Sequence, residues 1–274
     1  MKSTLLFFTI LLSVNSFSQN TEKLTKPIVE EGKKLYKSEM ASWYGTDLFI
    51  ANYTQKENIG GYFSYSDDEK ATCVFFSRDT SPKVIGTIKF DFTFDTKTAN
   101  TNLEERDFTA NEKELYVLRK ESQNLIATDT FFKHYENSSL NLIPLISNGV
   151  KKVYVLCGPK EHGVVLFGND YEIIFDKQNK VKSKKQLHKN IIPIYYKPED
   201  KDAESIHSHL PETGDFITAT DICTLMLYEK FAQWKNHLVV SKKYTSIWNC
   251  TTDELFVMKT EALEKIAKHQ NEKN

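Results

Sequence analysis

The stretch His207-Ser-His-Leu-Pro-Glu-Thr-Gly-Asp-Phe-Ile-Thr-Ala-Thr-Asp221 joins an expected strand to an expected helix. Ser205 and Ile206 lead into the two histidines as the end of the strand, where alternate side chains point to the same face. Asp221 begins an apolar run to Trp234 that is long enough for a buried helix. A strand, a polar loop and a helix in this order predict a fold that mixes both kinds of element.

Short extended segments surround this stretch on both sides. Pro193 limits its own segment to the edge of a sheet or to a bulge. A helix is expected to close the chain from about Thr260. The other expected strands of this half are 152–157, 164–167, 171–175, 190–196, 237–241, 244–248 and 254–258.

The first half has the same mixed character. A helix is expected over 26–43, with Pro27 in its first turn and its end near Gly45. Thr109-Ala-Asn-Glu112 is a capping box that starts a second helix, which we expect to end near residue 129. Antiparallel strands are expected at 60–65, 71–77 and 83–94, and 137–144 is expected to be a connection. The whole pattern predicts an α+β fold with a mostly antiparallel sheet and flanking helices.

Residues 1–18 have the three-part layout of a secretory signal peptide. Lys2 is followed by an apolar run over 5–12 and by Ser16 and Ser18 before Gln19. The run is too short to span a bilayer, and no later segment is apolar enough for a membrane helix. We therefore expect an exported chain, periplasmic or secreted, with no membrane anchor after cleavage. A boundary near residue 148 would divide it into an N-terminal α+β region of unknown role, 19–148, and a second domain, 149–274.

Composition excludes some partners and leaves the redox state open. The 36 basic and 37 acidic residues are balanced, so there is no electrostatic reason to expect nucleic acid as a partner. The lysine-rich segment 177–189 is interpreted as a solvated hairpin. Export would allow disulfides, but free, buried thiols are the default expectation for the cysteines, Cys73, Cys157, Cys223 and Cys250.

The two histidines and the aspartate indicate a zinc site. His207 and His209 would present two imidazoles side by side, and Asp221 could approach them from the start of the helix. Two imidazoles and one carboxylate leave a tetrahedral Zn²⁺ with one position open, which is the arrangement of catalytic sites. Water at such a site is acidified and can attack a carbonyl carbon.

The same residues resemble the motif of the JAMM (JAB/MPN) metallopeptidase family, His-x-His-Pro, six residues, then Ser-x-x-Asp. The resemblance covers about residues 150–259 and implies that His207, His209 and Asp221 hold zinc and that Thr218 stabilises an oxyanion. Glu161, in Glu161-His-Gly-Val-Val-Leu-Phe-Gly168, matches the upstream glutamate that acts as general acid and base. The resemblance implies hydrolysis of amide or isopeptide bonds in a peptide or protein substrate. As a whole, the chain is also similar to secreted proteins of Gram-negative bacteria.

Several alternatives remain open at this point. Residues 152–157 and 164–168 could form a hairpin that leaves Glu161 in solvent, and Glu204 and Glu229 are the fallback carboxylates. Thr218 and Asp221 could serve only as a helix cap. His188 and His237 are expected to be surface or structural histidines. The alternative to a hydrolase is a non-catalytic exported binding protein that keeps part of the motif.

Overall fold

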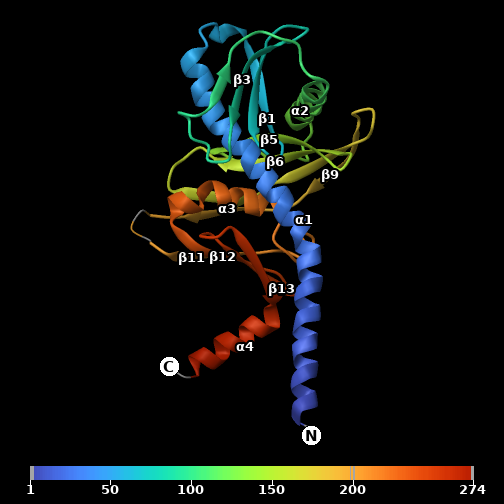
Figure 1. Ribbon diagram of the computed structural model, residues 1–274, viewed down its shortest axis with the longest axis vertical. Coiled ribbons are helices and arrows are strands. Elements are labelled where there is room, and N and C mark those ends of the chain that lie inside the picture. The colour runs from blue at the N-terminus through green and yellow to red at the C-terminus, as the bar shows by residue number, and fades with distance from the viewer. Residues whose placement is uncertain (1–2, 198, 200, 273–274) are drawn as a thin grey trace. The chain divides into compact units, whose positions relative to one another are not determined.

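The computed structural model describes the backbone of residues 3–197, 199 and 201–272, and the side chains from residue 21 onward except residue 271 (Figure 1). The chain forms two compact units, one of residues 34–196 and one of residues 1–33 with 197–274. The described residues contain four α-helices and mostly antiparallel sheets, so the predicted α+β class is confirmed. The predicted leader, 1–18, lies outside the residues whose side chains are described, and its removal stays a prediction.

The larger unit, residues 34–196, holds three sheets and two helical segments. One sheet has the order β1-β2-β3-β4, a second has the order β5-β6-β8-β9, and β10 pairs with β7 alone. The first sheet consists of β1 (Ile59–Ser66), β2 (Ala71–Ser77), β3 (Val84–Phe90) and β4 (Asn100–Asn102). The other strands are β5 (Ser138–Ser147), β6 (Val150–Pro159), β7 (Val164–Gly168), β8 (Tyr171–Phe175), β9 (Val181–Gln186) and β10 (Ile191–Tyr195). The helical segments are the end of α1 (Ser3–Asn52) and α2 (Ala110–Thr128), with a short 3-10 turn at Lys56–Asn58.

Helix α2 supplies buried side chains to two apolar clusters of this unit. Its capping box forms as predicted, with Thr109 and Glu112 each accepting a hydrogen bond from the other's backbone N–H. Leu115 packs with Phe63 and other residues of the first sheet, whereas Leu118 packs with Tyr171 and other residues of β6 and β8. Burying one such side chain stabilises a fold by roughly 1.5–3 kcal/mol, so these clusters hold α2 in place.

Helix α1 is longer than the sequence predicts, and Gly45 explains the error. Glycine often ends a helix, but α1 continues to Asn52. A Cβ at Gly45 would lie 2.7 Å from the Cβ of Cys73 in β2, so the missing side chain lets the helix approach the sheet. Pro27, which was expected in the first turn, lies inside α1. The glycine therefore serves packing between elements and not helix termination.

One prediction about the middle of the chain is wrong, and the expected domain boundary coincides with a hairpin turn. Of residues 137–144, expected as a connection, all but the first belong to strand β5, where Pro144 pairs opposite Val153. Proline fits there because β5 is an edge strand. The boundary expected near 148 falls in the tight turn between β5 and β6, inside the larger unit, where Asn148 and Gly149 both have positive φ. Asn-Gly is the preferred sequence of such a hairpin turn.

The smaller unit contains the whole stretch His207–Asp221 and one sheet of order β11-β12-β13-β14. Strands β11 and β12 are parallel, and the other pairs are antiparallel. In Figure 1, α3 lies along one face of this sheet. Its elements are β11 (Ala203–Ser208), α3 (Ala219–Ala232), β12 (Trp234–Val240), β13 (Tyr244–Asn249), β14 (Glu254–Lys259) and α4 (Thr260–Asn271), with the first part of α1.

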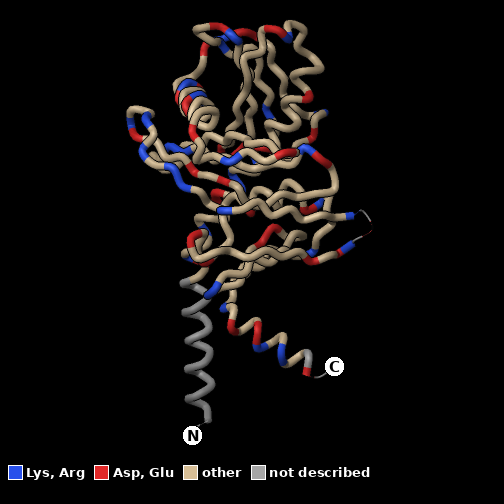
Figure 2. Tube along the Cα trace, turned by 180° about the vertical axis from the view of Figure 1, so that it is seen from behind, with Lys and Arg blue, Asp and Glu red and all other residues tan. Residues whose placement is uncertain are grey.

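Two further predictions from composition are confirmed. The lysine-rich segment forms the turn after β8 and the exposed strand β9 of a hairpin, and its positive residues can be followed in Figure 2. All four cysteines are free and buried. In the part of the chain that is described, no helix combines the length and the apolar character needed to cross a membrane.

Candidate metal centre

Strand β11 directs alternate side chains inward, as its period predicts. Ser205, His207 and His209 are buried, whereas the intervening Ile206 and Ser208 are exposed. The backbone N–H of His209 donates to the carbonyl oxygen of Val240 at 2.9 Å, which continues the pairing with β12 beyond the end of β11. Both imidazoles therefore lie on the same face of the sheet.

The loop between His209 and α3 is fixed to the rest of the smaller unit. The Ser246 hydroxyl accepts from the backbone N–H of Ile217 at 3.1 Å, and the Ser241 hydroxyl donates to the carbonyl of Asp215 at 2.9 Å. Lys243 forms an ion pair with the Asp215 carboxylate at 2.8 Å. These contacts place the start of α3 beside the end of β11.

A second capping box starts α3 and orients the Asp221 carboxylate. Asp221 Oδ2 accepts from the Thr218 backbone N–H at 2.9 Å and from the Thr218 hydroxyl at 2.8 Å. The Thr218 hydroxyl oxygen in turn accepts from the Asp221 backbone N–H at 3.1 Å. The cap that the sequence offered as an alternative is therefore present, and the helix dipole favours the negative charge of Asp221 at this position.

The same carboxylate lies against both histidines. His209 Nε2 is 3.2 Å from Asp221 Oδ2, His207 Nε2 is 3.6 Å from Asp221 Oδ1, and the two Nε2 atoms are 3.2 Å apart. All three side chains are buried. Capping alone does not explain why two imidazole nitrogens converge on the capping carboxylate.

The spacing of these donors suits a single small cation. Two ligand atoms bonded to zinc at about 2.0–2.1 Å, with a tetrahedral angle between the bonds, lie about 3.3 Å apart. The His207 Nε2–His209 Nε2 and His209 Nε2–Asp221 Oδ2 separations, both 3.2 Å, are close to that value, and His207 Nε2 lies 3.6 Å from the other oxygen of the same carboxylate. His207, His209 and Asp221 could therefore bind a metal ion with little movement.

A second layer of hydrogen bonds holds the ring of His207. Its Nδ1 lies 2.8 Å from His237 Nε2, and His237 Nδ1 lies 2.7 Å from the Ser205 hydroxyl. Burial lowers the pKa of His237 well below its ordinary value, and the adjacent His207 lowers it further, so His237 is neutral. A neutral ring accepts at one nitrogen and donates at the other, so the protons of this chain can point in one of two directions.

Only one of these directions suits metal binding. If His207 Nδ1–H donates to His237, then His237 Nδ1–H donates to Ser205, and the lone pair of His207 Nε2 faces Asp221 and His209. This is the arrangement in which a metal ligand is oriented by the partner of its other ring nitrogen. His237 and Ser205 were not predicted as site residues. His237 is fully buried, as a structural histidine can be, and its contact orients the ring of His207.

The other carboxylates and histidines considered from the sequence have local environments of their own. Glu161 is exposed in a bend between β6 and β7 of the larger unit, and these two strands are not paired with each other. Glu204 is exposed and accepts from Asn236 at 3.2 Å, so it faces away from the buried histidines. His188 belongs to the larger unit, where it is buried 3.4 Å from Asp170 Oδ2.

Glu229, the other fallback carboxylate, serves the packing of α3. It is buried, and its Oε2 accepts from Trp248 Nε1 in β13 at 3.0 Å. Burial raises the pKa of Glu229 to about 8, with a further increase from the adjacent Asp253. The protonated carboxyl is therefore the favoured form near neutral pH.

Comparisons with known proteins add no relative. No protein-family model, curated protein or solved structure matches this chain significantly. The argument for function therefore rests on the geometry of the site and on the motif.

Proposed function

We propose that His207, His209 and Asp221 bind zinc and that the chain is an exported hydrolase of amide or isopeptide bonds in a peptide or protein. The observation that carries the proposal is the convergence of two imidazole nitrogens and one carboxylate within 3.2–3.6 Å in a buried site. Two histidines and one carboxylate are a ligand set of catalytic zinc sites. The motif resemblance to JAMM metallopeptidases supplies the reaction class.

The residues of this chain prepare the site before any ion binds. His237 fixes the orientation of the His207 ring, and Ser205 fixes that of His237. Thr218 holds the Asp221 carboxylate through two hydrogen bonds. When bound, zinc would acidify water and polarise a carbonyl group, which is the chemistry that hydrolysis of an amide requires.

The catalytic roles of Glu161 and Thr218 stay predictions from the motif. The Thr218 hydroxyl donates to Asp221 and accepts from its backbone, so it acts here as a positioning residue. Glu161 would serve as general acid and base, and its exchange for glutamine would test that role through the pH profile of cleavage.

Zinc content is the first test. After dialysis, the purified protein should retain about one zinc per chain by plasma mass spectrometry, because three protein ligands suffice for a catalytic site. His207→Ala and His209→Ala should lose it, whereas His162→Ala removes an exposed histidine and should keep it. A wild-type protein without zinc, or equal loss in all three variants, would contradict the proposal.

Cleavage is the second test. Wild-type protein incubated with a mixture of peptides should generate new termini that mass spectrometry detects, and Asp221→Asn or a chelator should abolish them. Zinc binding without any cleavage would favour the alternative, a non-catalytic exported binding protein that uses the metal to hold its partner or its fold.

A further inference from the structure

A second candidate site lies wholly within the larger unit. Residues from α1, α2, β1 and β5 surround a cavity of about 340 Å³. Ligand pockets commonly have volumes of about 300–1,000 Å³, so this one can hold a small molecule. Its lining combines apolar residues with several polar groups, among them the cations Arg119 and Lys160 and the carboxylate of Glu39.

Arg119 faces this cavity with its hydrogen-bonding capacity unused. Its Nε is buried without a hydrogen-bond partner, and no hydrogen bond or ion pair of its guanidinium exists among the described residues. The guanidinium carbon lies 5.3 Å from the centroid of the Tyr62 ring, a cation–π contact that holds the group without satisfying its donors. Burial lowers the pKa of Arg119, but a guanidinium remains charged at neutral pH. Arg119 as a whole is half-buried, and its buried Nε is costly to leave without a hydrogen-bond partner unless a ligand supplies one.

Glu39 presents the opposite charge to the same cavity. Its Oε2 accepts one hydrogen bond, from Asn141 Nδ2, at the long distance of 3.4 Å. Burial raises the pKa of Glu39 to about 7, against the opposing effect of the Arg119 charge. No ion pair joins Glu39 to Arg119 within the described chain, although both line the cavity. The two groups therefore line the same space and interact through their charges without forming a direct ion pair.

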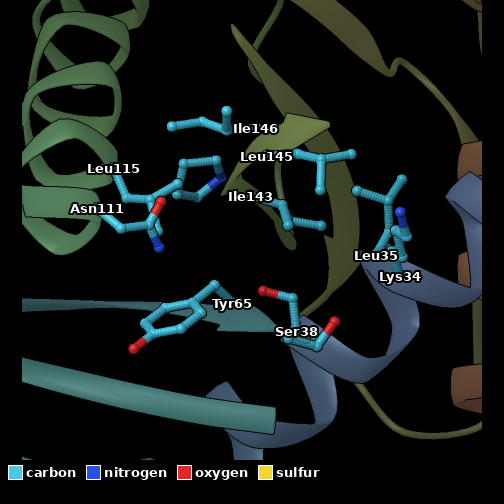
Figure 3. Close-up of a pocket in the computed structure, with 11 residues that line it drawn as sticks. Lys34, Leu35, Ser38, Tyr65, Asn111, Leu115, Ile143, Leu145 and Ile146 are labelled. Carbon is cyan, nitrogen blue, oxygen red and sulfur yellow. The ribbon is translucent and has the colours of Figure 1, made fainter. Parts of the chain in front are cut away.

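A smaller cavity of the same unit provides a contrast (Figure 3). It measures about 60 Å³ and is lined mainly by apolar side chains and by Lys34. The Lys34 ammonium is exposed and donates to Ser147 at 3.3 Å. This cavity holds no buried charge that lacks a partner, so we assign it no ligand.

We propose that the cavity between Arg119 and Glu39 binds a small zwitterion, a free amino acid or a short peptide, whose carboxylate pairs with Arg119 and whose ammonium group pairs with Glu39. The planar guanidinium matches a carboxylate through two parallel hydrogen bonds. Ile126, Leu140 and Leu142 provide apolar contacts for the carbon skeleton. A ligand with both charges can pair with both of these half-buried groups at once, which a simple anion cannot.

The site is independent of the proposed metal centre, so each can fail alone. It gives the N-terminal half of the chain, which has no catalytic motif, a binding role. Such a site could belong to a sensor of amino acids or to a region that recognises the ends of a peptide substrate. The ligand groups that bind, a carboxylate and an ammonium, are the same in both cases.

The experiment uses the whole purified protein and the common L-amino acids, tested singly at millimolar concentration by thermal shift and then by calorimetry. At least one should raise the melting temperature and bind measurably. Arg119→Gln should abolish that binding and Arg119→Lys should weaken it at least about tenfold, because an ammonium lacks the fork geometry. Lys120→Gln, which removes the exposed cation next in sequence, should leave affinity unchanged.

Derivatives of the best ligand test the second contact. Its N-acetyl form should bind at least about tenfold more weakly to the wild type, and Glu39→Gln should remove most of that difference. Far-UV circular dichroism checks that each variant is folded, and Glu39→Gln tests the site even if Arg119→Gln does not fold. The proposal is overturned if no amino acid binds, if Arg119→Lys binds as tightly as the wild type, or if inorganic phosphate binds as well as the best amino acid.

Discussion

Asp221→Asn separates the helix cap that the Asp221 carboxylate forms from the metal-ligand role that we propose for it. Both hydrogen bonds from Thr218 end on Oδ2, so the single oxygen of an asparagine side chain can accept both. The amide nitrogen then replaces Oδ1, which lies 3.6 Å from His207 Nε2. The substitution therefore keeps most of the cap and removes the charged donor to a metal.

The expected magnitudes differ for the two roles. Loss of the charge–dipole interaction at the helix start costs about 0.3–1 kcal/mol, with or without zinc. If zinc affinity falls about 100-fold, the linked stability falls by a further 2.7 kcal/mol or so. At about 2–4 °C per kcal/mol, the apo protein should lose roughly 1–4 °C and the zinc-loaded protein roughly 5–11 °C more.

The assay is a pair of calorimetric melts, one with zinc and one with chelator, for the wild type and the variant. Glu112→Gln is the matched control, because Glu112 is the third helical residue of the other capping box and has Arg106 rather than histidines beside it. Glu112→Gln should lower the melting temperature by the same amount with zinc and with chelator. Equal losses for Asp221→Asn with zinc and with chelator would refute the ligand role and leave the cap as the full explanation.

Four further outcomes are expected. His237→Ala should lower zinc affinity about 10–100-fold while all three ligands remain, as competition titration would measure. Glu229→Gln should change how stability depends on pH: the raised pKa makes the wild type most stable below the ordinary pKa of a glutamate and less stable as pH rises through about 8, whereas denaturant melts of the variant should be flatter over that range. The four buried thiols should react with a disulfide reagent only on unfolding, since burial raises the pKa of Cys73 to about 12 and that of Cys157 to about 11. Amino-terminal sequencing of the exported protein should start near Gln19, and retention of residues 1–18 would contradict the leader.

Local signals in the sequence predict much of the fold. The capping boxes at Thr109 and Thr218 mark the starts of α2 and α3 correctly, because a cap depends on residues three positions apart. Period-two alternation likewise identifies β11 and the facing of its histidines. Each of these features depends on residues only a few positions apart in the chain, so a single sequence is enough to predict it.

Features that depend on distant partners are harder to predict. Gly45 ends no helix, because its role depends on Cys73 in a strand that follows later in the chain. The hydrogen bonds from His207 through His237 to Ser205 depend on the parallel register of β11 and β12, which pairs Ser205 with His237. Nothing near His237 in the sequence indicates that register. A Ser-x-His-x-His strand followed by a lone histidine in a later strand is the signal that could have suggested it.

The cap and the metal site need not compete. The cap already holds the Asp221 carboxylate in one orientation, which metal binding would otherwise have to impose. Holding a carboxylate in one orientation costs side-chain entropy, and the hydrogen bonds from Thr218 meet that cost when the protein folds. His237 does the same for the His207 ring. A site organised in this way should bind zinc without a large rearrangement, and the smaller unit should remain folded when zinc is removed. Chelator should therefore lower the melting temperature of the wild type without unfolding it at room temperature, which far-UV circular dichroism can follow. Unfolding on chelation would instead indicate that zinc is a structural element of the fold, as in small zinc domains.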